Sequence, residues 1–284
     1  MLENNHSIQI NINLAETNMV KITNIEIKTS KIKISNGELQ IDAYLAEPVQ
    51  AGVFGAVIVF PEIFGVNGNI RDITELIATQ GYVAVAPAMY QRIAPGFEVD
   101  YSPNDIEYSP EAYQLGLQYY QQVKYQEIFS DIQAAIAYLK TLPNVNGNKI
   151  GAIGFCFGGH VAYMAATLPD IKATASFYGG GITTSSYGEE TPTINRTSSI
   201  KGTIYTFFGN RDTLISQTEN EQIEAELKKH QINHRVFRYD AGHGFFHGFF
   251  KDKYPLIEQH PSYNPEAAPH AWQRVLELFQ NHLN

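Results

Sequence analysis

Short apolar runs that alternate with helical patterns constrain the fold of this chain more than any other feature. Residues 56–60 (Ala-Val-Ile-Val-Phe) and 82–86 (Tyr-Val-Ala-Val-Ala) are such runs, and Ile70, Ile73 and Ile77 recur between them at helical spacing. A strand without polar alternation is buried on both faces, so helices must cover both sides of its sheet. The sequence therefore predicts an α/β protein with a mostly parallel sheet.

The same alternation continues to the end of the chain. Four further strands are predicted at residues 149–155, 173–178, 203–208 and 235–239. Four further helices are predicted at residues 128–139, 161–168, 221–229 and 267–283. No internal repeat or long linker divides the pattern. One domain is therefore predicted over residues 19–284, with residues 1–18 as a flexible tail.

An antiparallel hairpin is predicted before the first parallel strand. An extended pattern begins near Val20 and passes through Ile27, and Leu39 and Ile41 alternate with polar residues after it. The pair Asn36-Gly37 between them is a turn signal, so the two segments are expected to pair.

The composition excludes several classes of protein. An apolar fraction of 44% among 284 residues is enough for a buried core. The 29 acidic residues outnumber the 20 basic ones, and a net charge of -9 argues against a nucleic-acid partner. No apolar stretch is long enough to cross a membrane. One cysteine makes neither an intramolecular disulfide nor a thiolate zinc site. Residues 1–13 are polar, unlike a secretory signal, which predicts a cytoplasmic protein.

The segment 154–159, Gly-Phe-Cys-Phe-Gly-Gly, is the most informative motif. It joins a predicted strand to a predicted helix and has the pattern glycine-x-nucleophile-x-glycine, with Cys156 as the nucleophile. The glycines relieve collisions at a sharp turn, and the adjacent helix N-terminus favours a thiolate. Free cysteines are also often small buried apolar residues, and this alternative for Cys156 stays open.

A cysteine nucleophile needs a base, and the base needs an acid that orients it. Asp212 follows the predicted strand at 203–208, and His243 follows the strand at 235–239. Both then lie at the carboxyl ends of parallel strands, the edge where open α/β sheets carry their chemistry. The order Cys156, Asp212, His243 is that of nucleophile, acid and base in hydrolases with such an elbow. The sequence therefore predicts a Cys-His-Asp triad.

Cofactor and metal sites are not predicted. His243 and His247 are four residues apart, but glycines between and around them oppose a helix, and no carboxylate is placed as a third ligand. No phosphate-binding loop or dinucleotide fingerprint occurs, so no cofactor is expected.

Five motifs in register resemble the dienelactone hydrolase family over about residues 25–283. They are Pro61-Glu62-Ile63-Phe64-Gly65, Pro87-Ala88-Met89-Tyr90-Gln91-Arg92, the cysteine segment 154–159, Gly209-Asn210-Arg211-Asp212 and Ala241-Gly242-His243-Gly244-Phe245. The resemblance implies an α/β-hydrolase fold, with a mostly parallel central sheet, helices on both faces and an N-terminal antiparallel hairpin. It also implies a carboxymethylenebutenolidase-like hydrolase that acts on a small-molecule lactone or carboxylic ester through a thioacyl intermediate.

The resemblance assigns further residues to the site. Glu62 matches a glutamate that contacts the cysteine and helps to generate the thiolate when substrate binds; taken alone, it is an ordinary loop carboxylate. The backbone N–H groups of Ile63 and Phe157 match the oxyanion hole. Arg92 matches the first of two arginines that bind the substrate carboxylate. The second position is His247 here, and an imidazole binds an anion less well than a guanidinium, which puts the family's original substrate in doubt.

Several alternatives remain open from the sequence. The chain is also compatible with a binding module that kept the fold without catalysis, or with a redox role for its single thiol. The phenylalanines of segment 245–250 either line an apolar pocket or pack against the last helix. The tyrosine-rich segment 101–125 is either part of a lid or a surface helix, and segment 179–199 is long enough to be functional or mobile. A homo-oligomer is also compatible with the sequence.

Overall fold

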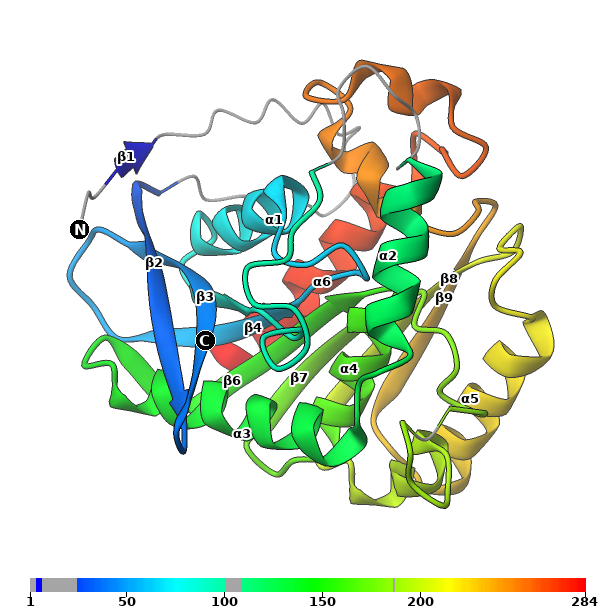
Figure 1. The fold of residues 1–284 in the computed structure, drawn as a ribbon, viewed down its shortest axis with the longest axis horizontal. Helices are drawn as coiled ribbons and strands as arrows, with labels where there is room; N and C mark the ends of the chain where they lie inside the picture. Colours follow the sequence, from blue (N-terminus) through cyan, green and yellow to red (C-terminus); the bar gives the residue numbers. More distant parts are fainter. Residues whose placement is uncertain (1–3, 7–24, 101–108, 186) are drawn as a thin grey trace.

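The protein forms one mixed sheet, seen in a computed structural model that describes residues 4–6, 25–100, 109–185 and 187–284. Among the described residues the sheet has nine strands in the order β1-β2-β3-β5-β4-β6-β7-β8-β9 (Figure 1). Six strands are parallel to one another: β4 (Phe54–Phe60), β5 (Val83–Pro87), β6 (Val145–Phe155), β7 (Ile171–Phe177), β8 (Thr203–Gly209) and β9 (His234–Tyr239). The predicted parallel sheet is confirmed.

The antiparallel part of the sheet lies at its N-terminal edge. It consists of β1 (Asn4–His6), β2 (Ile27–Asn36) and β3 (Leu39–Pro48). The predicted hairpin is the β2–β3 pair. Its turn is Gly37 and Glu38, one residue later than the sequence signal, with Gly37 at a φ of 62° that suits glycine. Of the predicted tail, residues 1–18, only Asn4–His6 lies within the described residues, and its flexibility stays a prediction.

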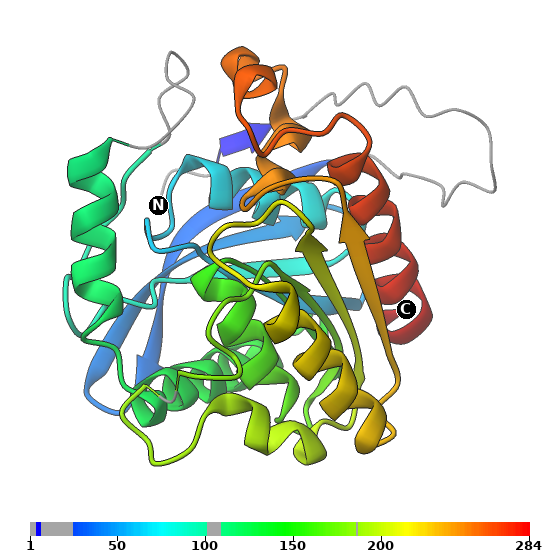
Figure 2. The same ribbon diagram turned by 90° about the vertical axis from the view of Figure 1, so that its right-hand side faces the viewer.

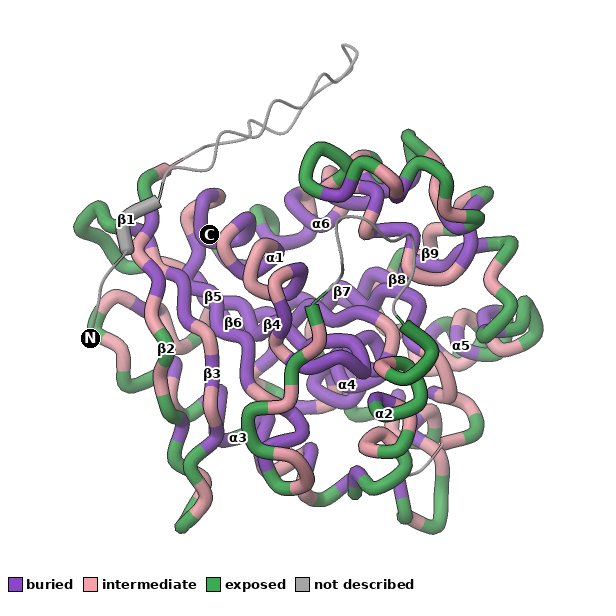
Figure 3. The backbone as a smooth tube through the Cα atoms, turned by 45° about the horizontal axis from the view of Figure 1, so that its top comes forward, coloured by how far each residue is buried: buried purple, intermediate pink, exposed green. Residues whose placement is uncertain are grey.

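Helices cover both faces of the sheet because successive residues of each strand point to opposite sides. In β4, Ile58 belongs to one core cluster and its neighbours Val57 and Val59 to the other. One face is covered by α1 (Gly68–Ala78) and α6 (Ala267–Leu283), and the other by α3 (Tyr125–Thr141), α4 (Phe157–Ala166) and α5 (Gln217–Lys229). Figure 2 shows α6 on one side of the sheet, and Figure 3 shows the central strands buried along their length.

The remaining elements are short and lie around the carboxyl edge of the sheet and its flanks. They are α2 (Pro110–Tyr120), η1 (Thr193–Ser199), η2 (Phe245–Phe250) and η3 (Pro255–Gln259). Within segment 101–125, residues 110–120 form a largely exposed helix, which agrees with one of the two interpretations of this segment. Residues 101–108 lie outside the described residues. The short 3-10 helices have no sustained period of 3.6 residues, so that period in the sequence does not indicate them.

Candidate active site

Cys156 lies at the turn between β6 and α4, as the motif predicts. Its backbone is at φ 54° and ψ -115°, a strained conformation for a residue with a side chain. A hydrogen bond stabilises this conformation: the Cys156 N–H donates to the carbonyl of Phe177 at 3.1 Å. A Cβ at Gly154 would come within 1.9 Å of the Gly158 carbonyl oxygen, and one at Gly158 within 2.2 Å of the Phe60 carbonyl oxygen. The two glycines therefore let β4, β6 and α4 approach closely enough to make the turn.

Asp212 and His243 meet at the carboxyl ends of β8 and β9. His243 Nδ1 lies 2.8 Å from Asp212 Oδ2. The other carboxylate oxygen of Asp212 accepts from the backbone N–H groups of Leu214 and Ile215, at 2.8 Å and 3.1 Å. With the Asp212 side chain only 1% exposed, these bonds fix the carboxylate and hence the plane of the imidazole.

The second ring nitrogen of His243, Nε2, is available for proton transfer because Asp212 contacts only Nδ1. Nε2 is buried and, apart from the Cys156 thiol, has no hydrogen-bond partner among the described residues. Burial alone would lower the pKa of His243, but the negative charge of a Cys156 thiolate and the hydrogen bonds to Asp212 and Cys156 raise it well above its usual range. The imidazolium is therefore the favoured form of His243 while a thiolate stands beside it.

Glu62 and His247 form a second pair in the same region. Glu62 is 4% exposed, and its Oε2 lies 3.0 Å from His247 Nε2. Burial raises the pKa of Glu62, but the charge and hydrogen bond of His247, with a smaller contribution from His243, lower it overall. The two residues that the resemblance assigns to thiol activation and to substrate binding are thus bonded to each other.

Arg92 lies elsewhere. Its Nη2 and Nε are 2.7 Å and 3.3 Å from the two carboxylate oxygens of Asp131, a buried residue of α3. It borders a separate cavity of about 870 Å³ and is absent from the residues that line the pocket around Cys156. Tyr120 lines both cavities and separates them.

A pocket of about 750 Å³ joins the other predicted site residues except Asp212, which is connected to it through its bond to His243. Its polar part contains Glu62, Cys156, Arg211, His243, His247, His260 and Ser262, and it also includes Ile63 and Phe157. Its remaining walls include residues of α2 and of the segment after Asp212. Helix α2 lies in segment 101–125, for which a lid is one of the two interpretations, whereas the segment after Asp212 is not predicted to line the site. The spacing of Tyr113, Leu117 and Tyr120 is the signal that could have indicated a lining face on α2.

The phenylalanines of segment 245–250 pack against the last helix. Phe246 and Phe249 lie 6.3 Å and 5.9 Å from the ring of Trp272 in α6, and Phe245 and Phe246 are buried. The structure therefore favours packing over a role as pocket lining for these residues, which anchor the segment just after His243.

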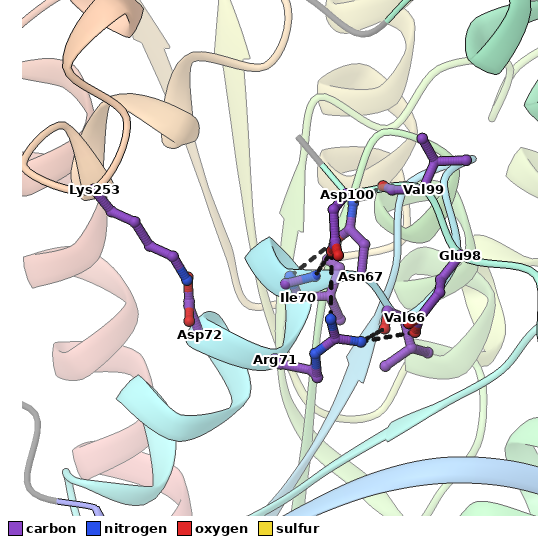
Figure 4. A network of polar contacts seen from close by, with 10 residues as sticks. Val66, Asn67, Ile70, Arg71, Asp72, Glu98, Val99, Asp100 and Lys253 are labelled. Atoms are coloured by element: carbon purple, nitrogen blue, oxygen red, sulfur yellow. Dashed lines mark hydrogen bonds and ion pairs between the residues drawn. The ribbon is translucent and has the colours of Figure 1, made fainter. Parts of the chain in front are cut away.

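The loop that carries Glu62 and Ile63 is anchored by a polar network at the start of α1 (Figure 4). Arg71 donates to the Val66 carbonyl at 2.7 Å and pairs with Glu98 at 2.7 Å and Asp100 at 3.3 Å. Asn67 caps α1 by accepting from the Ile70 N–H. These contacts tie the loop to segment 98–100 and so hold the Glu62 side of the pocket.

His160 lies behind the site and does not line it. Its Nε2 is 2.6 Å from the hydroxyl of Thr193, and its Nδ1 is 3.0 Å from the carbonyl of Gly180, which does line the pocket. The hydroxyl of Tyr187 also lies 2.9 Å from Nδ1 and can accept as well as donate. Because the Gly180 carbonyl only accepts, Nδ1 carries the proton of the neutral ring. Burial outweighs the bond to Gly180 and lowers the pKa of His160 to about 3.

This buried histidine makes the stability of the protein depend on pH. Because the unfolded chain binds a proton at His160 below about pH 6.5 and the folded chain does not, its contribution is present above that pH and is lost as pH falls toward 3. Urea unfolding of wild type and His160→Asn should show a stability difference that shrinks by roughly 1 kcal/mol per pH unit between pH 6.5 and 5. A difference independent of pH would show that His160 titrates alike in both states.

The described residues contain neither a membrane-spanning helix nor a cluster of metal ligands. No helix within the described ranges is long and apolar enough to cross a membrane. No group of three or more His, Cys, Asp or Glu residues in that part of the chain could hold a metal ion.

The fold and the site define a class of protein. A mostly parallel sheet with a strand–elbow–helix turn, and with an acid and a histidine after later strands, is an α/β-hydrolase fold. The chain matches the sequence profile of the Dienelactone hydrolase family over residues 41–283, and it belongs to that family. It is a dienelactone hydrolase-like enzyme, a hydrolase that acts on carboxylic ester or lactone bonds.

Individual relatives agree with this membership. A protein of Synechocystis sp., provisionally named carboxymethylenebutenolidase, is 51% identical to this chain over 259 residues. The match covers 91% of this chain and 99% of the relative. The structure of a dienelactone hydrolase-like promiscuous phosphotriesterase from metagenomic libraries superposes with a TM-score of 0.71 at 22% identity, covering 91% and 99%. A dienelactone hydrolase of Anabaena variabilis gives a TM-score of 0.61 at 16% identity, with the same coverage. The last two show the fold alone.

Proposed function

We propose that this protein hydrolyses a lactone or carboxylic ester through a thioacyl intermediate on Cys156. The observation that carries the proposal is that Cys156 shares one pocket with His243, whose buried Nε2 has no partner among the described residues other than the Cys156 thiol, while Asp212 holds Nδ1. A histidine held in this way serves a nucleophile as base and then as acid.

In the first half of the reaction the Cys156 thiolate attacks the carbonyl carbon. The negative charge that develops on the carbonyl oxygen is stabilised by the N–H groups of Ile63 and Phe157, two residues that line the same pocket as Cys156. The tetrahedral intermediate then collapses, the bond to the leaving oxygen breaks, and the His243 imidazolium gives its proton to that oxygen. The thioester and the alcohol are the products.

In the second half, neutral His243 takes a proton from water as the water attacks the thioester carbonyl. The carbon–sulfur bond breaks, the acid leaves, and the thiolate and imidazolium are restored. The raised pKa of His243 suits the first half, because it keeps the proton on the ring until the leaving oxygen needs it. Once the sulfur is acylated, the thiolate charge that raises the pKa is gone, so His243 can act as the neutral base of the second half.

Glu62 enters the proposal as a conditional base. While His247 donates to it, its lowered pKa makes it a poor acceptor for a thiol proton. Where Cys156 is a neutral thiol beside neutral His243, a substrate that breaks the contact with His247 frees the Glu62 carboxylate to take the thiol proton and pass it to His243, which gives the thiolate–imidazolium pair of the first step. Activation of the sulfur is then coupled to occupation of the pocket.

The first test is turnover of p-nitrophenyl acetate by the wild-type enzyme before and after alkylation with iodoacetamide. We expect a burst of one p-nitrophenol per enzyme followed by slower turnover, since the thioacyl intermediate accumulates when deacylation limits the rate. Alkylation should abolish both phases, and because the chain has one cysteine the adduct lies on Cys156. Full turnover by completely alkylated enzyme would contradict the proposal.

A further inference from the structure

Helix α2 presents one continuous face to the pocket. Pro110, Tyr113, Leu117 and Tyr120 all line it, and their spacings of three and four residues place them along one side of the helix. From Tyr113 to Tyr120 this face extends about 10 Å along the helix axis. Figure 2 shows α2 at the outer edge of the molecule, on the opposite side from α6.

The face is fixed in place by a glycine. Gly116 is the one buried residue of α2, and a Cβ there would lie 2.8 Å from the Ile63 carbonyl oxygen. Glycine is a poor residue for a helix interior, but here it lets the helix touch the backbone of the loop that carries Glu62. The α2 face therefore begins beside Ile63, one of the two proposed donors to the carbonyl oxygen of the substrate.

Apolar side chains also stand exposed at the pocket mouth. Tyr113 is 38% exposed and lies 6.5 Å from the ring of Phe64, and Leu214 across the pocket is 58% exposed. Leu214 is followed by Ile215, which is buried and lines the same wall. Exposed apolar groups that continue into a concave site indicate a ligand with a matching apolar part.

We infer that the enzyme acts on esters whose acyl group is an aliphatic chain of about four to eight carbons, and that this chain lies along the α2 face. The inference rests on the proposed function. We place the acyl chain of the ester along α2, and not its alcohol part, because α2 contacts the loop of Ile63. The leaving oxygen, by contrast, has to meet His243, on the loop after β9. Leu117, in the middle of the α2 face, is the residue that selects for chain length.

The test compares p-nitrophenyl acetate, butanoate, hexanoate and octanoate. In wild type, kcat/KM should rise about 4-fold for each methylene up to hexanoate, the factor expected when each methylene is buried. Leu117→Gln should lower the hexanoate-to-acetate ratio by at least about 10-fold, whereas Leu117→Met should keep it. Leu115→Gln is the matched control, because Leu115 is on the same helix, is 37% exposed and does not line the pocket. Gln and Leu have similar helix propensities, so both variants should keep α2.

A flat dependence on acyl length in wild type would overturn the inference, as would equal losses in Leu117→Gln and Leu115→Gln. The placement of the acyl chain along α2 would be wrong if kcat/KM rose with the length of the alcohol chain in a series of alkyl acetates but not with the length of the acyl chain in the p-nitrophenyl esters. Alkylation of Cys156 by iodoacetamides with longer N-alkyl chains needs no turnover. Faster labelling by the N-hexyl reagent in wild type but not in Leu117→Gln would support the apolar face even if no ester were hydrolysed, in which case the proposed function alone fails.

Discussion

Replacing Cys156 by alanine is expected to lower kcat/KM on p-nitrophenyl acetate by about 10⁴-fold. The reason is the loss of the only thiol in the chain, since removing the nucleophile of a triad leaves just the contributions of the oxyanion hole and of binding. Steady-state kinetics at one pH, with the uncatalysed rate subtracted, give the factor.

The fold is the control for this variant. Alanine has to adopt the same φ of 54° as cysteine, so the backbone strain is unchanged and the midpoint of thermal unfolding should stay close to that of wild type. Because residues that act as a unit are not additive, His243→Ala and the double variant should be nearly as inactive as Cys156→Ala alone. A Cys156→Ala enzyme that keeps a tenth of its activity would refute the role of the sulfur, and a further large loss in the double variant would show that His243 acts independently of it.

The sequence predicts best what depends on neighbours in the chain. The strand, the elbow at Cys156 and the helix after it follow from a glycine pattern and a continuous apolar run. Asp212 and His243 follow because the ends of parallel strands share one edge of the sheet. Their bond of 2.8 Å is consistent with that rule, although no distance could be predicted from the sequence.

The sequence predicts poorly what depends on which side chains meet across the fold. Glu62 and His247 are 185 residues apart, and their bond is the reason Glu62 is held as a carboxylate. Arg92 is paired with Asp131 on α3 and does not reach the pocket, because a partner on a buried helix face leaves no signal in the arginine's own motif. The sequence leaves segment 101–125 open between a lid and a surface helix for a similar reason: the apolar residues of α2 are half-exposed, so their pattern resembles that of an ordinary surface helix.

Gly158→Ala is expected to destabilise the protein by about 3 kcal/mol, although alanine is ordinarily the better residue in a helix by about 1 kcal/mol. The two effects have opposite signs, and the geometry decides between them. The new Cβ would lie 2.2 Å from the Phe60 carbonyl oxygen and 2.6 Å from that of Pro61. Both atoms are backbone at the end of β4, so the clash is relieved only by moving α4 or the strand.

The same substitution should also impair catalysis in the fraction that folds. Pro61 precedes Glu62 and Ile63, and a shift of this backbone displaces the carboxylate and one oxyanion-hole donor from the sulfur. Urea unfolding measures the loss of stability. Gly147→Ala is the matched control, because its Cβ meets only the side chain of Lys140, at 3.1 Å, which can move aside, so its stability should change by less than about 1 kcal/mol. If Gly158→Ala proved as stable as wild type, α4 and β4 would have to lie farther apart than the elbow geometry requires, and the strained conformation of Cys156 would lose its structural cause.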